Sequence, residues 1–534
     1  MPELDLAPLD IKFTQRFSGN FLSNVAYFIL NIIIGLALVP FFLDVLGEAA
    51  YGLIPLATSI TSYVTLFIDA VNTSVSRFLT IDLQRGDAAN ANRTFNTALF
   101  GTLGIIILTV PVALGAAWMA PSFFNIGDQA ASDVFLLFAL VFGSVLIRAW
   151  SSNFMVTLFA YNRLDLRNYV NITNLVVQLF LVVVLFICLG PSLVLVGCSY
   201  LAAACAAFVM AFTLSRRQCP FLEISPKYFV RSSFGELVGT AGWFAFISIG
   251  NLLFMNVALV IVNKLFGEVA GAEYSLAFMW GTLLFGIASL VTNVFAPMFF
   301  SYYTKGDTTG LIWFGSFSIR CTGLFIALPI GLVCVFAPQL LTLWIGAEYA
   351  RLAPLVWIIV LPVLVRVQAG CIYPIYVAYK RVRAPAFATC IVGVLNVVLA
   401  LSLPFVFDIG MYGVAYASAI SMVLFSVGFS SLYNAYVVGA PRFEFLKQML
   451  VGVCALGVLC VAGSAVMSIL SVTGIAPLSV VTTSTLPTLI LVGCGIAVTY
   501  LLFVLKVILH PEERKMIWSC LPRMCQRRIP SWLL

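Results

Sequence analysis

Apolar segments of about 20 residues recur along the whole chain, and this feature limits the possible folds more than any other. A helix needs about 20 apolar residues to cross the hydrocarbon core of a bilayer. The apolar runs are continuous and do not alternate with polar residues, which argues against a transmembrane β-barrel. We therefore predict an all-α polytopic membrane protein.

The composition supports this class. Of the 534 residues, 62% are hydrophobic and only 9% are charged, whereas soluble domains carry about 25% charged residues. Residues 1–20 are polar and the first apolar segment is long enough to span, so no cleavable signal peptide is expected. The 13 cysteines are mostly single and the chain has one histidine, His510. We expect neither a metal site nor a cofactor.

Fourteen apolar segments are long enough to be membrane spans, with edges good to a few residues. No loop between them is long enough to fold alone, so any function is carried out within or across the bilayer. The predicted spans are 22–45, 51–76, 96–119, 134–160, 169–190, 193–214, 238–264, 273–300, 317–338, 353–378, 386–407, 412–435, 448–470 and 486–508.

The basic residues are distributed unequally between the two sides of the membrane. Every second loop, together with both termini, holds 24 of the 28 Lys and Arg residues, whereas the other loops hold only Lys264 and Arg351. Cytoplasmic loops of membrane proteins are enriched in Lys and Arg. The pattern predicts a multi-pass protein of the cell (plasma or inner) membrane with cytoplasmic termini. It also explains the net charge of +7 without a nucleic-acid partner.

Two arginines, Arg148 and Arg366, lie near the middle of predicted spans. An ionised group there is costly unless it faces a water-filled cavity or a partner. The two are 218 residues apart, and each is followed thirteen residues later by a tyrosine and a basic loop: Tyr161-Asn162-Arg163 and Tyr379-Lys380-Arg381. Matching intramembrane charges in two halves predict a duplicated transporter with a central cationic cavity.

Other residues repeat at nearly the same separation, in the same order. Pro111 pairs with Pro329, Gly86-Asp87 with Gly306-Asp307, and Asn174 with Asn396. We predict an N-lobe of six spans (1–214), a C-lobe of six spans (215–447), and two extra spans with a cytoplasmic tail (448–534). Each lobe contains an even number of spans, so the lobes are parallel repeats about an axis along the membrane normal.

Three stretches near the N-terminus resemble a family signature. They are Leu46-Gly47-Glu48-Ala49-Ala50-Tyr51-Gly52-Leu53, Phe67-Ile68-Asp69 and Ser76-Arg77-Phe78-Leu79. They are similar to the pattern of Wzx-like polysaccharide biosynthesis flippases, members of the multidrug/oligosaccharidyl-lipid/polysaccharide exporter superfamily. The fourteen spans, two lobes and positive loops extend the resemblance over the whole chain.

The resemblance implies a function. Such proteins move an oligosaccharide on a polyprenyl (di)phosphate from the cytoplasmic to the outer leaflet, for polysaccharides such as O-antigen lipopolysaccharide or exopolysaccharide. It implies two lobes in a V-shaped arrangement that rock by alternating access. It also implies membrane lipids as partners, energy from a Na⁺ or H⁺ gradient or from downstream consumption, and a polymerase or ligase of the same pathway. No covalent chemistry, and so no enzyme, is expected.

Candidate site residues follow from the problem of moving a phosphate and sugars through hydrocarbon. Arginine stays charged and binds phosphate through two parallel hydrogen bonds, so Arg148 and Arg366 are the first candidates; the alternative is an ion pair with Asp69 or Asp133. Asp69 is either a gate or coupling carboxylate or a structural one. The remaining candidates are equally compatible with helix contacts or orientation: Arg77, Arg320, Asn153, Asn174 and Asn396.

Three rival functions remain open. A lipid II flippase has the same architecture, although an arginine-rich first span is not evident here. A drug or cation antiporter of the same superfamily typically has twelve spans and central carboxylates. A membrane-bound polymerase or glycosyltransferase usually has a large outer loop or acidic metal motifs, and this sequence contains neither.

Overall fold

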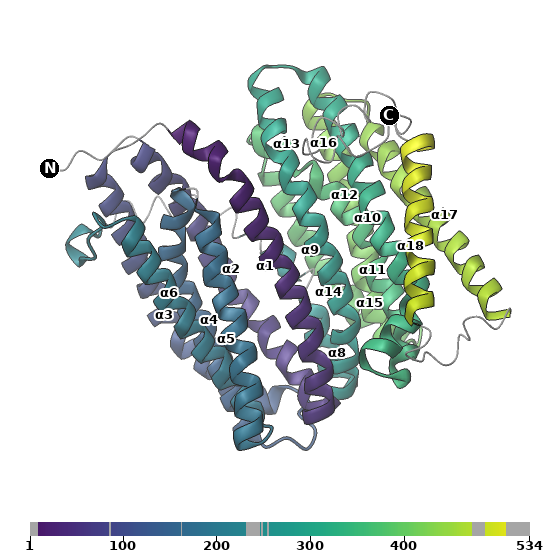
Figure 1. Ribbon diagram of the computed structural model, residues 1–534, viewed down its shortest axis with the longest axis horizontal. Coiled ribbons are helices and arrows are strands. Elements are labelled where there is room, and N and C mark those ends of the chain that lie inside the picture. Colours follow the sequence, from purple (N-terminus) through teal and green to yellow (C-terminus); the bar gives the residue numbers. More distant parts are fainter. Residues whose placement is uncertain are drawn as a thin grey trace. The chain divides into compact units, whose positions relative to one another are not determined.

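The computed structural model describes residues 9–84, 87–161, 163–230, 246, 249–253, 256–472 and 486–508. Within these residues every regular element is a helix (Figure 1). In the first part of the chain the helices are α1 (Leu9–Leu46), α2 (Glu48–Gln84), α3 (Ala88–Phe123), α4 (Ala131–Ala160), α5 (Leu164–Leu189) and α6 (Leu193–Gln218), followed by the short 3₁₀ helix η1 (Pro226–Tyr228).

The rest of the described chain is also helical. Its elements are α8 (Val257–Phe266), α9 (Glu268–Thr304), α10 (Thr308–Ile345), the 3₁₀ helix η2 (Ala347–Leu352), α11 (Ala353–Val360), α12 (Val363–Cys371), α13 (Tyr373–Ala378), α14 (Arg383–Val406), α15 (Met411–Val423), the π-helix η3 (Leu424–Ser430), α16 (Ser431–Val438), α17 (Glu444–Val472), α18 (Leu486–Phe503) and the π-helix η4 (Val504–Ile508).

The all-helical membrane fold is confirmed. Within the described residues, 12 helices are long and apolar enough to cross a membrane. The two other predicted spans, 51–76 and 273–300, lie within α2 and α9. The predicted span 353–378 is part of one of these twelve, Ala347–Ala378, and it consists of the three consecutive helices α11, α12 and α13. Pro362, which precedes α12, and Pro374, at the start of α13, lack the backbone N–H that a continuous helix requires.

The order of the elements supports the internal duplication. Helices α2 and α9 are each 37 residues long and begin 220 residues apart. The next helices, α3 and α10, are both N-capped by aspartate: Asp87 (φ −85°, ψ 81°) accepts from the backbone N–H of Asn90, and Asp307 (φ −83°, ψ 82°) from that of Gly310. The Gly-Asp pairs of the sequence are therefore repeated start signals for the third helix of each half.

The chain divides into two compact units. Unit 1 comprises the described residues up to Ser275 together with Thr389–Val414, and unit 2 comprises Leu276–Ala388 and those from Ala415 onward. Each unit has its own apolar core, with Leu79, Phe95 and Phe154 in unit 1 and Phe299 and Phe314 in unit 2. The two units are defined by which residues contact one another, whereas the predicted lobes are defined by the internal sequence repeat. The lobe boundaries at residues 214 and 447 stay a prediction.

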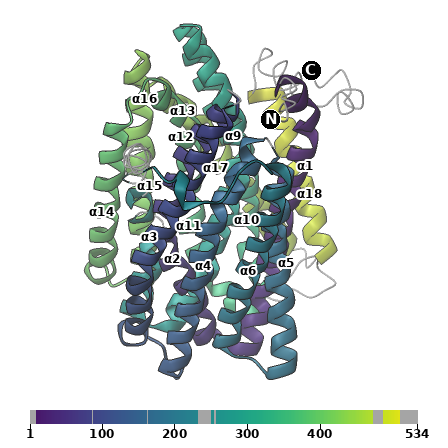
Figure 2. The same cartoon turned by 90° about the vertical axis from the view of Figure 1, so that its left-hand side faces the viewer.

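Helices α1 to α6 of unit 1 run alongside one another (Figure 2), and α6 is followed by an extended segment clamped to α3. Asn92 donates to the carbonyl of Phe221 (3.1 Å) and accepts from the N–H of Glu223 (2.8 Å). Asn96 donates to the carbonyl of Glu223 (2.7 Å) and accepts from the N–H of Ser225 (2.9 Å). These two buried amides satisfy the backbone groups of a segment that has no strand partner. In the same segment, the hydrogen bond from Tyr228 to the Glu223 carboxylate raises the pKa of Tyr228.

A second clamp in unit 1, the Asn125–Asn263 clamp, joins the α3–α4 loop to the end of α8. The Asn125 backbone N–H donates to Asn263 Oδ1 (3.2 Å), Asn125 Nδ2 to the Asn263 carbonyl (2.7 Å), and Asn263 Nδ2 to the Asn125 carbonyl (3.3 Å). Lys264 Nζ donates to the carbonyl of Phe123 and lies 4.9 Å from the centroid of its ring. Lys264, one of two bases in the predicted outer loops, thus takes part in this clamp.

In unit 2 the C-terminal helices pack on α10. The buried Gln368 of α12 donates from Nε2 to the carbonyls of Ile319 on α10 (3.4 Å) and Met449 on α17 (3.3 Å). The Tyr500 hydroxyl of α18 donates to the carbonyl of Leu324 on α10 (2.9 Å). These hydrogen bonds give the two buried donors carbonyl partners on neighbouring helices. Helices α17 and α18, the predicted extra spans, are therefore integral parts of unit 2.

The helices α14 and α15 approach closely at Gly413, and this contact leads to a prediction about stability. A Cβ on Gly413 would lie 2.6 Å from the Pro404 nitrogen and 2.7 Å from its Cα, atoms that cannot move aside. We expect Gly413→Ala to cost about 1–3 kcal/mol through overpacking and to lower the thermal unfolding temperature of the detergent-solubilised protein. The matched control is Gly457→Ala in α17, where a Cβ meets nothing within 4 Å. Equal unfolding temperatures for the two variants would contradict the prediction.

Candidate functional site

A cavity of about 440 Å³ lies inside unit 1, between α2, α4, α5 and α6. The two predicted candidates Arg148 of α4 and Asn174 of α5 both line it. Residues of the three consecutive helices α4, α5 and α6, together with two from α2, thus contribute to one site. The complete lining is Thr58, Thr61, Val141, Ser144, Val145, Arg148, Ala149, Ser151, Ser152, Met155, Arg167, Val170, Asn171, Asn174, Tyr200 and Ala207.

The cavity is cationic. Arg148 and Arg167 are its two charged lining residues, and none of the other lining residues is acidic. Both side chains are solvent-accessible, and among the described side chains no carboxylate pairs with either of them. Because a guanidinium stays protonated, the cavity has two fixed positive charges and a set of N–H donors available to an anion.

Helical spacing explains how the sequence builds this lining. On α4, Ser144, Arg148, Ser151 and Met155 follow one another at intervals of four, three and four residues. On α5, Arg167, Asn171 and Asn174 follow at intervals of four and three. Residues at these intervals lie on one face of a helix. One face of each of these two helices, polar except for Met155, therefore lines the cavity.

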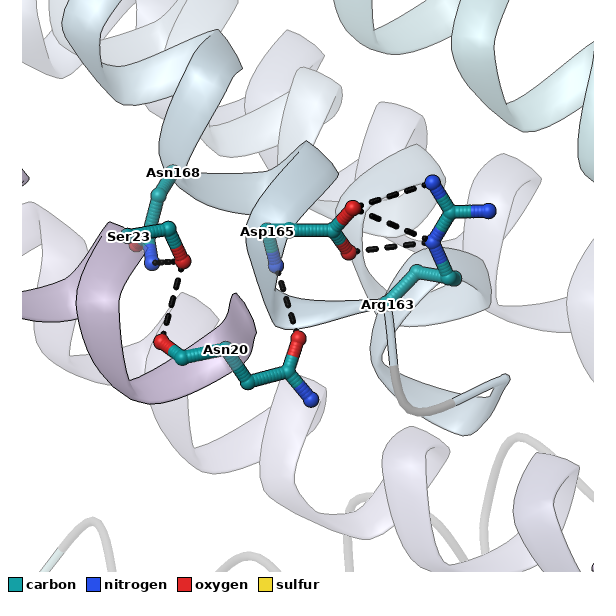
Figure 3. Close-up of polar contacts among 5 residues, drawn as sticks. All are labelled: Asn20, Ser23, Arg163, Asp165 and Asn168. Carbon is teal, nitrogen blue, oxygen red and sulfur yellow. Dashed lines mark hydrogen bonds and ion pairs between the residues drawn. The ribbon is translucent and has the colours of Figure 1, made fainter. Parts of the chain in front are cut away.

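A polar network on another face of α5 holds α1 against it (Figure 3). Asn20 Oδ1 of α1 accepts from the backbone N–H of Asp165 (3.1 Å), and Asn168 Nδ2 donates to Ser23 Oγ (3.0 Å). Arg163 Nη2 forms an ion pair with Asp165 Oδ2 at 3.0 Å. Arg167 is one turn from Arg163, so the network fixes the part of α5 from which Arg167 enters the cavity.

Neutral polar groups complete the cavity wall. The buried Ser151 hydroxyl has no hydrogen-bond partner among the described residues, and an unsatisfied buried hydroxyl costs free energy unless a ligand or water pairs with it. Tyr200 of α6 adds a hydroxyl to the lining, and Asn171 and Asn174 of α5 add two amides. Two guanidinium groups can bind phosphate oxygens, while the amides and hydroxyls can pair with sugar hydroxyls.

The structure gives different surroundings to the predicted asparagines. Asn153 is buried between helices, accepting from Thr102 Oγ1 on α3 (3.4 Å) and donating to the Trp150 carbonyl (3.1 Å). Asn396 is buried on α14 and donates to the Leu253 carbonyl (3.1 Å). It lies thirteen residues into α14, whereas Asn174 lies ten residues into α5. The two asparagines therefore do not occupy matching positions.

The predicted arginines of the second half lie in unit 2. Arg366 is on α12, half-buried, with Cζ 5.2 Å from the centroid of the Phe425 ring on η3. Arg320 is a half-buried residue of α10. Asp133 is in the first turn of α4, fifteen residues or about 22 Å of helix from Arg148, so the alternative pairing of these two residues is wrong. The side chains of Arg77 and Asp69 lie outside the described residues.

Several lining residues were not among the sequence candidates, above all Arg167, Tyr200 and Ser151. Arg167 was counted only as a basic residue of a cytoplasmic loop. The signal that identifies it is the stripe Arg167, Asn171 and Asn174 along α5. No comparable sequence signal marks Tyr200, because its position depends on how α6 packs against α4.

Known proteins are similar to this chain in sequence and in fold. Residues 18–303 match the family described as polysaccharide biosynthesis protein. The chain is 27% identical over 505 residues to the membrane protein EpsK of Bacillus subtilis (strain 168), covering 94% of this chain and 97% of that protein.

Solved structures of the MOP superfamily have the same fold. The lipid II flippase MurJ, in an inward closed conformation, has a TM-score of 0.64 at 14% identity, covering 91% of this chain and 100% of MurJ. An inward-facing multidrug resistance MATE transporter has a TM-score of 0.63 at 11% identity, covering 82% and 98%. The family match extends over more than half of the chain, which confirms the resemblance noted in the sequence: the chain belongs to the polysaccharide biosynthesis protein family.

Proposed function

We propose that this protein is a flippase that moves a polyprenyl-(di)phosphate-linked oligosaccharide from the cytoplasmic to the outer leaflet by alternating access. The observation that carries the proposal is the cavity of unit 1, with two arginines and no acidic residue in its lining. A phosphate linked to sugars needs cationic donors beside neutral hydrogen-bonding groups, and this cavity contains both. Membership of the family supports the same substrate class.

The cavity argues against the antiporter alternative. A cationic drug entering it would meet Arg148 and Arg167 with no carboxylate in the lining to balance its charge. The cavity does not argue against the lipid II flippase alternative, because two arginines could bind any lipid head group that carries a phosphate. The fold likeness to MurJ is compatible with it. The choice between a polysaccharide precursor and a peptidoglycan precursor therefore depends on a transport measurement.

The test is transport in proteoliposomes. A fluorescent undecaprenyl-diphosphate oligosaccharide is incorporated, and its accessibility to a membrane-impermeant quencher is followed with and without Na⁺ and H⁺ gradients. Fluorescent lipid II and a cationic dye are measured in parallel. We expect the oligosaccharide lipid to cross faster than in protein-free vesicles. Transport of lipid II or of the dye without transport of the oligosaccharide lipid would replace the proposal by the corresponding alternative.

The sequence also predicts a plasma-membrane location with cytoplasmic termini, which the proposal requires because the substrate is assembled on the cytoplasmic leaflet. An ion gradient and a polymerase or ligase acting on the exported lipid remain part of the proposal. The gradients in the transport measurement test the first of these.

A further inference from the structure

Four aromatic residues of unit 2 form one continuous row, which we name the aromatic track: Phe425, Phe429, Tyr433 and Tyr436. Neighbouring ring centroids are 5.8, 5.1 and 6.4 Å apart along the row, and the rings of Phe429 and Tyr433 are stacked with an interplanar angle of 14°. The track begins in η3 and continues into α16.

The π-helix keeps these rings in line. In an α-helix with 3.6 residues per turn, positions four apart drift steadily around the axis. The wider turn of η3 offsets this drift, because a π-helix bonds residues five apart; here the N–H of Ser431 bonds the carbonyl of Ser426. Phe425, Phe429 and Tyr433, each four residues apart, therefore share one face across the change from π-helix to α-helix.

Arginines lie at both ends of the aromatic track. Arg366 Cζ is 5.2 Å from the centroid of Phe425, and Arg381 Cζ is 5.8 Å from that of Tyr436. The Tyr433 hydroxyl donates to the Arg381 carbonyl (3.2 Å). The bilayer penalises a charge that is exposed to lipid, and the half-buried Arg366 packs against the ring of Phe425. This end of the track therefore adjoins a positive charge.

Accessibility increases along the track. Phe425 is 8% exposed, Phe429 and Tyr433 are half-buried, and Tyr436 is 71% exposed. The track starts beside Arg366, which lies in a predicted span, and ends at the predicted cytoplasmic end of α16, with tyrosine hydroxyls in its accessible half.

We propose that the aromatic track binds the glycan of the transported lipid, by stacking sugar rings on Phe429, Tyr433 and Tyr436. A pyranose ring presents C–H groups on its faces and hydroxyls at its edge. Aromatic faces match the former, and tyrosine hydroxyls and arginine N–H groups match the latter. A polyprenyl tail has no groups for these hydroxyls and charges. This inference rests on the proposed function and adds to it a glycan subsite in unit 2, separate from the cavity of unit 1.

The test compares two ligands of the purified protein in nanodiscs. One is undecaprenyl diphosphate without sugar. The other is the lipid-linked oligosaccharide extracted from the native host after deletion of the gene for this chain. We expect the wild type to bind the oligosaccharide lipid about tenfold more tightly than undecaprenyl diphosphate. The variant Phe429→Leu/Tyr433→Leu should bind the two lipids equally well, because it loses the affinity contributed by the glycan. Its affinity for undecaprenyl diphosphate should stay within about twofold of that of the wild type.

Further variants keep the test decisive if the double variant fails to fold. Tyr436→Leu changes an exposed side chain and should remove part of the preference for the oligosaccharide lipid. Tyr433→Phe keeps the ring and should retain most of it. Tyr169→Leu, an exposed tyrosine of α5 outside the track, is the matched control and should change nothing. The proposal is overturned if the wild type binds the oligosaccharide lipid no more tightly than undecaprenyl diphosphate. It is also overturned if Tyr436→Leu and the double variant keep the full preference for the oligosaccharide lipid. Binding of neither lipid instead overturns the proposed function.

Discussion

Replacing both cavity arginines, in the variant Arg148→Gln/Arg167→Gln, is expected to lower the transport rate of the oligosaccharide lipid by about 100-fold or more, since hydrogen bonds to charged groups contribute about 1.5–3 kcal/mol each. Glutamine keeps much of the side-chain length and polarity but removes both charges. The measurement is the quencher-accessibility assay in proteoliposomes. The effect belongs to substrate binding because neither arginine pairs with a described carboxylate.

Two controls separate charge from geometry and from nonspecific effects. Arg148→Lys keeps the charge but loses the planar pair of donors, so we expect an intermediate loss of about tenfold. Arg217→Gln removes an exposed arginine at the end of α6, outside the cavity lining, and should transport like the wild type. All variants should unfold at the same temperature. Full transport by the double variant would contradict the role of the cavity and leave the substrate phosphate without its binding site.

Covalent closure of the Asn125–Asn263 clamp is expected to stop transport. In an alternating-access carrier the outer contacts between its two lobes must separate to release the substrate. The clamp joins the predicted N-lobe, at the α3–α4 loop, to the predicted C-lobe, at the end of α8, and both elements lie on the side that the charge pattern predicts as outer. In the variant Asn125→Cys/Asn263→Cys, oxidation to a disulfide should lower the rate by at least about tenfold.

Reduction of that disulfide should restore transport, which distinguishes blocked opening from a misfolded protein. The single variants Asn125→Cys and Asn263→Cys retain the native cysteines and, treated with the same oxidant, control for any other disulfide. Unfolding temperature is measured for each. If the cross-linked protein transports at the full rate, the clamp stays closed throughout the cycle and the outer opening lies elsewhere.

The candidate site was only partly predictable from the sequence. Arg148 was identifiable because a charge in an apolar span is costly wherever the helix packs. Arg167 was not, because the predicted edge of its span placed it in a loop, and helix α5 begins earlier, at Leu164. Asn153 and Asn174 look alike in sequence, since each is an amide in an apolar span. The first pairs with α3 and the second lines the cavity.

The sequence by itself determined the all-helical membrane class, the positions of the spans, the repeated Gly-Asp helix starts and the family. These follow from local properties: the length of apolar runs, the capping preference of aspartate and a contiguous motif. Only the tertiary structure decided which polar residues meet in the cavity, which are consumed in helix contacts such as that of Asn396, and that the aromatic track lies between Arg366 and Arg381. Helical periodicity assigns a residue to a face, but the neighbour of that face depends on helix packing between segments distant in sequence.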